Sequence, residues 1–172
     1  MSTTRKNRRL VKKGVEKALT KHPCGPCAAC CTTMQVAEIA KAEGARCPNL
    51  VMKAEGEGCG IYSKRPESCR SFNCVWRVGL LDSLLPGIPG RPDQLGLLFD
   101  INNTHAEGIH LLVVREIATG AVEKNMKLLH ELAAQGHVMY LIEGDRRRMM
   151  GPEERVNAVQ EAARRRLPLH MQ

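Results

Sequence analysis

The sequence predicts an α+β fold in which a cysteine-rich module precedes a small β-β-α-β-α layer. Two observations support this prediction. All eight cysteines lie between Cys24 and Cys74. After the Pro- and Gly-rich boundary at residues 86–93, strand-like apolar runs and runs with helical spacing follow one another. At 172 residues with 3% aromatic content, the chain can form one core of mostly aliphatic side chains.

Residues 1–21 are predicted to form a basic N-terminal arm. Eight basic residues there stand against Glu16, a net charge of +7, so the rest of the chain carries only +1 of the total of +8. This pattern indicates contact with nucleic acid or another acidic partner. The alternative is a solvated tail, since no aromatic side chain is interleaved to stack on bases.

Residues 22–78 form the predicted cysteine-rich module. Thr32 stands three residues before Gln35, the spacing of a capping box, which predicts a helix from Thr32 that stops at Gly44. Pro66 favours a short helical turn within residues 65–72. A buried segment is expected to follow and to end before Pro86.

Residues 79–172 form the predicted α+β region, which we expect to pack with the module as one unit. Its apolar patterns predict three strands and two helices. The strands are expected at 95–102, 108–117 and 137–142, and the helices at 121–136 and 151–166. This order suggests helices packed on one face of a single sheet.

The cysteine spacing is the main chemical signal in the chain. Cys24, Cys27 and Cys30 form a C-x2-C-x2-C run, and Gly25-Pro26 favours a tight turn that points two sulfurs inward. Three thiolates at this spacing suit three irons of a 4Fe–4S cube, and equally three corners of a tetrahedral zinc site. Further ligands are available from the remaining cysteines, which are Cys31, Cys47, Cys59, Cys69 and Cys74.

Cys30 and Cys31 are neighbours whose side chains leave the backbone in different directions. If Cys30 closes the first site, we expect Cys31 to point away as a free, reactive thiol beside the helix predicted from Thr32, whose N-terminus lowers its pKa. Alternatively, Cys31 binds a second metal. Eight thiols allow two zinc sites of four thiolates each, or one cluster with spare thiols.

The expected compartment favours metal binding over disulfides. No apolar run is long enough to span a bilayer, and no apolar stretch follows the basic N-terminus as in a signal peptide. We therefore expect a cytoplasmic protein without membrane contact. Thiols in the cytoplasm are kept reduced, and dense cysteine patterns there more often bind metal.

The motifs "CGPCAACC", "CPNL" and "GCGIYSKRPESCRSFNC" carry a resemblance to a known family. Residues 22–77 resemble the bacterial CxxCxxCC family of zinc- or iron-chelating domains, including the Ile61-Tyr62 and Arg65-Pro66 pairs. The resemblance implies a metal-binding domain holding Zn²⁺ or an Fe–S cluster. A related cysteine pattern occurs in enzymes that methylate flagellin lysines, but no methyl-donor site is evident in this chain.

Three side chains are expected to support the metal ligands. Arg65 and Arg70 would offset the negative charge of bound thiolates, and Tyr62 would add a hydrogen bond. The leading hypothesis is therefore a metal-binding protein. A structural-zinc adaptor that binds nucleic acid or a ribonucleoprotein through residues 1–21 is one alternative, and an iron–sulfur redox or methyltransferase-related enzyme is another.

Overall fold

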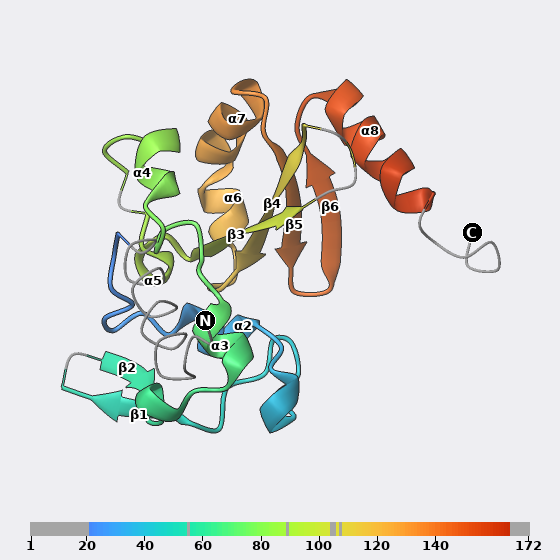
Figure 1. Ribbon diagram of the computed structural model, residues 1–172. Coiled ribbons are helices and arrows are strands. Elements are labelled where there is room, and N and C mark those ends of the chain that lie inside the picture. The colour runs from blue at the N-terminus through green and yellow to red at the C-terminus, as the bar shows by residue number, and fades with distance from the viewer. Residues whose placement is uncertain (1–20, 55, 89, 104–105, 107, 166–172) are drawn as a thin grey trace, which may run out of the picture.

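The computed structural model describes residues 21–54, 56–88, 90–103, 106 and 108–165 (Figure 1). The predicted basic arm, apart from Lys21, lies outside the described residues. Within the part of the chain that is described, no helix is both long and apolar enough to cross a bilayer.

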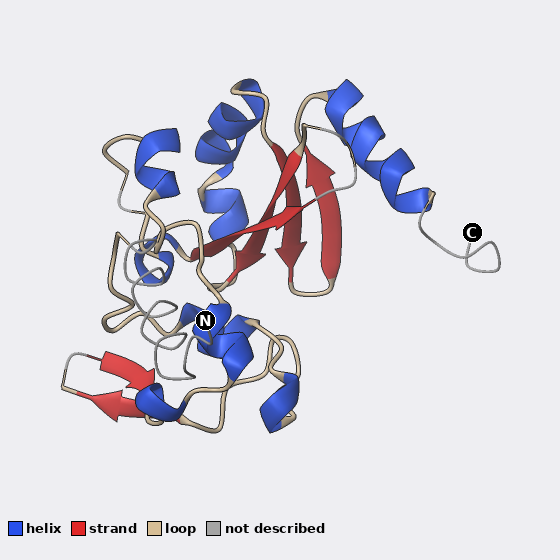
Figure 2. Cartoon of the chain, in the orientation of Figure 1, coloured by secondary structure: helices blue, strands red, loops and turns tan. Residues whose placement is uncertain are grey.

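A mixed four-stranded sheet occupies the second half of the chain (Figure 2). β3 pairs antiparallel with β4, β4 parallel with β5, and β5 antiparallel with β6. The parallel pair requires a crossover, which α6 and α7 provide. The bounds are β3 Leu97–Asn103, β4 His110–Glu116, β5 Val138–Glu143, β6 Arg146–Met150, α6 Ala121–Lys124 and α7 Met126–Ala134.

The three predicted strands are confirmed, but the β-β-α-β-α order is incomplete because β6 follows β5. Its first three residues, Arg146, Arg147 and Arg148, lie on an edge strand, where charged side chains are common because they discourage pairing with other chains. The order of the layer is therefore β-β-α-β-β-α.

The helix predicted at 121–136 is divided at Asn125 into α6 and α7. The Asn125 side chain donates hydrogen bonds to the carbonyls of Ala121 and Leu95, at 2.7 and 3.1 Å. The closing helix is confirmed as α8 (Glu153–Arg164). Two short helices, α4 (Leu80–Leu84) and α5 (Pro92–Leu95), connect the cysteine-rich region to the sheet.

The main core lies between one face of the sheet and the helices α4, α6 and α7. Leu97, Phe99 and Val114 of the sheet are at most 2% exposed and pack in one cluster with Leu129 and Leu132 of α7. Figure 1 shows α8 beyond β6, away from α6 and α7, and its buried Val159 is outside that cluster. The expectation of helices on one face therefore holds for α6 and α7 but not for α8.

The cysteine-rich region consists of short elements joined by turns, below the sheet in Figure 1. It contains one antiparallel hairpin, β1–β2, which the Gly-rich sequence gave no pattern to predict. The elements are α2 Ala29–Thr33, η1 Ala37–Ile39, β1 Leu50–Lys53, β2 Gly56–Cys59, η2 Tyr62–Lys64 and α3 Glu67–Ser71. The predicted turn near Pro66 is confirmed by α3, which follows that residue.

The helix predicted from Thr32 to Gly44 is wrong. Thr32 lies inside α2, and its hydroxyl donates to the Ala29 carbonyl instead of capping a new helix. The backbone then becomes extended, and Val36 and Lys41 exchange two backbone hydrogen bonds of 3.0 Å. This turn buries both side chains, which a solvated helix would expose.

Two contacts join the cysteine-rich region to the sheet. Val75, directly after the last cysteine, donates its N–H to the carbonyl of Phe99 in β3 at 2.9 Å. Arg115 of β4 lies 3.5 Å from the Glu43 carboxylate. The sheet thus supports one side of the region that holds the cysteines.

Candidate metal centre

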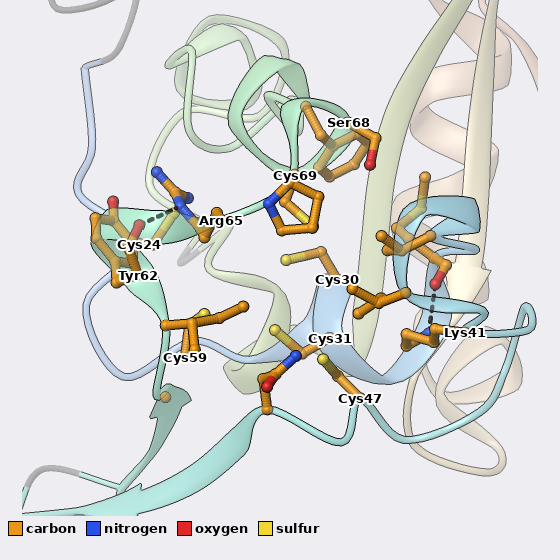
Figure 3. Close-up of a pocket in the computed structure, with 18 of the residues that line it drawn as sticks. Cys24, Cys30, Cys31, Lys41, Cys47, Cys59, Tyr62, Arg65, Ser68 and Cys69 are labelled. Atoms are coloured by element: carbon orange, nitrogen blue, oxygen red, sulfur yellow. Dashed lines mark hydrogen bonds between the residues drawn. The ribbon is translucent and has the colours of Figure 1, made fainter.

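All eight cysteines line two adjoining cavities, and none is in a disulfide. The larger cavity has a volume of about 180 Å³ and the smaller about 40 Å³. The larger is lined by seven cysteines, and Cys74 joins four of those seven around the smaller. In Figure 3 the side chains of Cys30, Cys31, Cys47 and Cys69 point toward a common space.

The predicted tight turn at Gly25-Pro26 is confirmed and places the first two thiols. Gly25 has a φ of +52°, which a side chain would disfavour, and the Cys27 N–H donates to the Cys24 carbonyl at 3.0 Å. Cys30 and Cys31 follow within α2. The run C-x2-C-x2-CC therefore forms one compact turn and helix along the cavity wall.

The other four cysteines come from separate elements. Cys47 precedes β1, and its N–H donates to the Cys31 carbonyl at 2.9 Å, which ties that loop to α2. Cys59 ends β2, and Cys69 lies in α3. Cys74 follows α3 just before the chain enters the core at Val75.

Burial keeps several of these thiols protonated in the absence of a partner. It raises the pKa of Cys27 to about 11, and it also raises the pKa values of Cys69 and Cys74. The pKa of Cys30 is raised first by its hydrogen bond to Cys31 and then by burial. A metal ion that bound these groups would therefore have to displace their protons.

Cys31 has the opposite character. The pKa of Cys31 is lowered to about 7, chiefly by the hydrogen bond from Cys30 and also by the nearby charges of Lys41 and Arg65, which together outweigh the opposite effect of burial. The hydrogen-bonded pair lines the larger cavity together. Our expectation that Cys31 points away at the start of a helix is therefore wrong, since it lies inside α2.

Four cations lie at the cavities, and one of them, Lys53, lines the larger cavity and donates to the Cys59 carbonyl at 3.0 Å. The Arg77 guanidinium donates to Cys24 Sγ at 3.2 Å. The buried Lys41 ammonium lines the larger cavity and donates to the carbonyls of Met34 and Ala42. Arg65 lines both cavities. Positive charge in these positions stabilises thiolates, as a site for a cationic metal with several thiolate ligands requires.

The predicted supporting residues are only partly at the cavities. Arg65 stacks on the Tyr62 ring, 3.7 Å from its centroid, and donates to the Tyr62 carbonyl at 3.0 Å. Arg70 instead pairs with Glu67 at 2.8 Å on the exposed side of α3 and lines neither cavity. Neither Arg77 nor Lys41 was predicted from the sequence as a residue near the thiols. Arg77 follows Cys74 by three residues, and this spacing could have indicated it. No feature of the sequence distinguishes Lys41.

The sulfurs converge on the cavities without yet forming a ligand shell. Within the described ranges, no three Cys, His, Asp or Glu side chains are grouped closely enough to hold a metal ion. His22, a conceivable nitrogen ligand, stacks on Trp76 and hydrogen-bonds the Asp82 carboxylate at 2.9 Å. The donor set around the cavities is thus composed of thiols.

Comparisons with models of known families, with curated proteins and with solved structures found no match for this chain. The residues at the cavities are therefore the basis for any statement about function.

Proposed function

We propose that this protein binds zinc or an iron–sulfur cluster through the thiolates of its cysteines. The observation that carries the proposal is the convergence of eight free cysteines, from six separate parts of the chain, on two adjoining cavities. Thiolates are the protein ligands that both groups prefer. The resemblance of residues 22–77 to the CxxCxxCC family agrees with this function.

The donor set fits such a group in charge as well as in chemistry. Four thiolates around a divalent ion leave a formal charge of −2, which Arg65, Arg77 and Lys41 are placed to offset. A cysteine side chain has a single heavy-atom torsion, χ1, so rotation about χ1 changes the direction in which its sulfur points. Zinc bound here would stabilise the fold, and an iron–sulfur cluster would supply electron transfer.

The larger cavity favours the cluster over a single ion. Its volume of about 180 Å³ is well above the roughly 15 Å³ that one water molecule requires. A group of several atoms fits that space better than one ion does. The number of thiols favours zinc instead, since eight ligands complete two tetrahedral shells.

The test is purification of the full chain without oxygen, followed by elemental analysis and an absorption spectrum. Iron with acid-labile sulfide and broad visible absorption would identify a cluster, and a colourless protein with stoichiometric zinc would identify zinc. A chain that contains neither metal, and that binds neither when reconstituted under reducing conditions, would contradict the proposal. Reducing conditions match the cytoplasm, where we expect this protein to function.

A further inference from the structure

The eight thiols do not all line the same space. Cys74 lines only the smaller cavity, whereas Cys31, Cys47 and Cys59 line only the larger one. The remaining four lie at the boundary and line both, namely Cys24, Cys27, Cys30 and Cys69. The two cavities therefore define two groups of sulfurs that share a wall.

Proximity among the thiols assigns three of the boundary cysteines. Cys74 is close enough to Cys24 and Cys27 for their charged forms to repel one another. Cys69 is likewise close enough to Cys31, Cys47 and Cys59 for their charged forms to repel its own. Cys24 and Cys27 thus belong with Cys74, and Cys69 belongs with the cysteines of the larger cavity.

Cys30 lies at the junction of the two groups. It lines both cavities, and the thiols that act on it are those of its sequence neighbour Cys31 and of Cys24 and Cys27. Four thiolates complete a tetrahedral zinc shell and also the usual shell of an iron–sulfur cluster. Cys30 therefore completes the group formed by Cys24, Cys27 and Cys74, which has only three thiols without it.

We propose that the chain holds two adjoining metal centres with four thiolates each, an inference that rests on the metal-binding function proposed above. The first is formed by Cys24, Cys27, Cys30 and Cys74, and the second by Cys31, Cys47, Cys59 and Cys69. Cys30 and Cys31, which are adjacent in the sequence, join the two centres; their side chains are labelled in Figure 3.

The cations divide in the same way as the sulfurs. Arg77 donates to Cys24 of the first centre at 3.2 Å. Lys41 lines only the larger cavity, and its charge acts on Cys31 of the second centre. Arg65 lines both cavities and stands between them. Each four-thiolate centre thus has a cation of its own, which offsets its negative charge.

The division is tested by native mass spectrometry and elemental analysis of the full chain purified without oxygen. Cys74→Ser and Cys47→Ser each remove a thiol that lines one cavity only. Each variant should lose half of the bound metal, and the double variant should lose all of it. Ser71→Ala is the matched control, because Ser71 lines neither cavity and its hydroxyl bonds only to carbonyls of its own helix.

The outcomes separate this inference from the proposed function. A wild-type chain without metal contradicts both. A wild-type chain with metal that is lost completely in Cys74→Ser and in Cys47→Ser contradicts the division alone, because it shows one shared centre. Retention of half the metal in each variant supports two centres.

A second measurement covers the case in which a serine variant fails to fold. Cobalt(II) added to the metal-free wild-type chain under reducing conditions produces thiolate charge-transfer absorption when it is bound. Two centres predict that this absorption rises until two equivalents are bound. Saturation at one equivalent would overturn the division.

Discussion

At the scale of single residues, Cys30 and Cys31 are the most informative pair in the molecule. They are adjacent in α2, yet the hydrogen bond between them raises the pKa of Cys30 and lowers that of Cys31 to about 7. Lys41 and Arg65 add positive charge on the side of Cys31. The metal-free chain therefore contains one thiol that is acidic among several that are not.

In the metal-free chain, Cys31 should be alkylated first. About half of it is thiolate at pH 7, whereas Cys27, with a pKa of about 11, is almost wholly protonated. After allowance for the weaker nucleophilicity of an acidic thiolate, Cys31 should react on the order of 100-fold faster than Cys27. Mass-mapped alkylation from pH 6 to pH 8 measures this, and the Cys31 rate should rise through pH 7 as its thiolate forms.

Cys30→Ala tests whether the hydrogen bond from Cys30 is what lowers the pKa of Cys31. Without the donor, the pKa of Cys31 should rise and its alkylation at pH 7 should slow, while Cys27→Ala should leave the Cys31 rate unchanged. Equal rates for Cys31 in wild type and Cys30→Ala would show that the hydrogen bond is not responsible.

Lys41 is the second residue with a distinct local role. It is 4% exposed, and its ammonium donates to the carbonyls of Met34 and Ala42 where the chain turns back on itself. Lys41→Met removes the donor to the Met34 carbonyl, whereas the Ala42 carbonyl still accepts from the Ala45 N–H at 3.3 Å, so we expect a loss of about 1–3 kcal/mol of unfolding free energy. Chemical denaturation measures this loss; Lys127→Met, at an exposed position on α7, should have little effect. Equal effects of the two variants would contradict the role of Lys41.

At the scale of elements, the two halves of the described chain have different sources of stability. The sheet and the helices α4, α6 and α7 bury a continuous aliphatic cluster. The cysteine-rich region has a two-stranded hairpin and helices of at most five residues, and such elements are marginal on their own. Metal ligation is the contribution that we expect to stabilise this region, on the order of 10 kcal/mol for structural zinc.

Removal of the metal should therefore loosen the elements unequally. After chelation, backbone amides in β1, β2 and α3 should lose protection against hydrogen exchange, while those in β4 and β5 keep theirs. Hydrogen exchange followed by mass spectrometry compares the two regions in one sample. Unchanged protection of β1 and β2 after confirmed loss of metal would contradict the dependence of this region on metal.

The sequence predicted the elements that follow from periodicity and missed those that depend on distant contacts. The apolar runs located β3, β4 and β5 because each strand buries neighbouring apolar side chains, such as Leu97, Leu98 and Phe99 in β3. The segment after Thr33 turns back because Val36 and Lys41 are buried beside the cysteines, and no local pattern encodes that contact. β6 was missed because an edge strand can carry three successive arginines.

The candidate site was predictable in its residues but not in its arrangement. Spacing alone singled out the eight cysteines, and the turn at Gly25 was expected from its sequence. Which thiols share a cavity depends on how α2, β2 and α3 meet, and that is fixed by the tertiary structure. Arg70 illustrates the limit, because it is adjacent to a cysteine in sequence but pairs with Glu67 instead.

At the scale of the whole molecule, the sheet serves as a support for the thiol-lined cavities. Leu98 of β3 and Pro92 of α5 form part of the wall of the smaller cavity, and the N–H of Asp93 reaches Cys27. The half of the chain that contains the sheet thus helps to position the first cysteines. The central claim that follows is ligation of a metal by these thiolates.

X-ray absorption at the metal edge of the full chain, purified without oxygen, tests that claim most directly. Ligation by these thiolates predicts a first coordination shell of about four sulfurs per metal, at about 2.3 Å for zinc. For an iron–sulfur cluster it predicts, in addition, a second shell of iron. A first shell composed mainly of oxygen or nitrogen would contradict the account, because it would place the metal away from the cysteines.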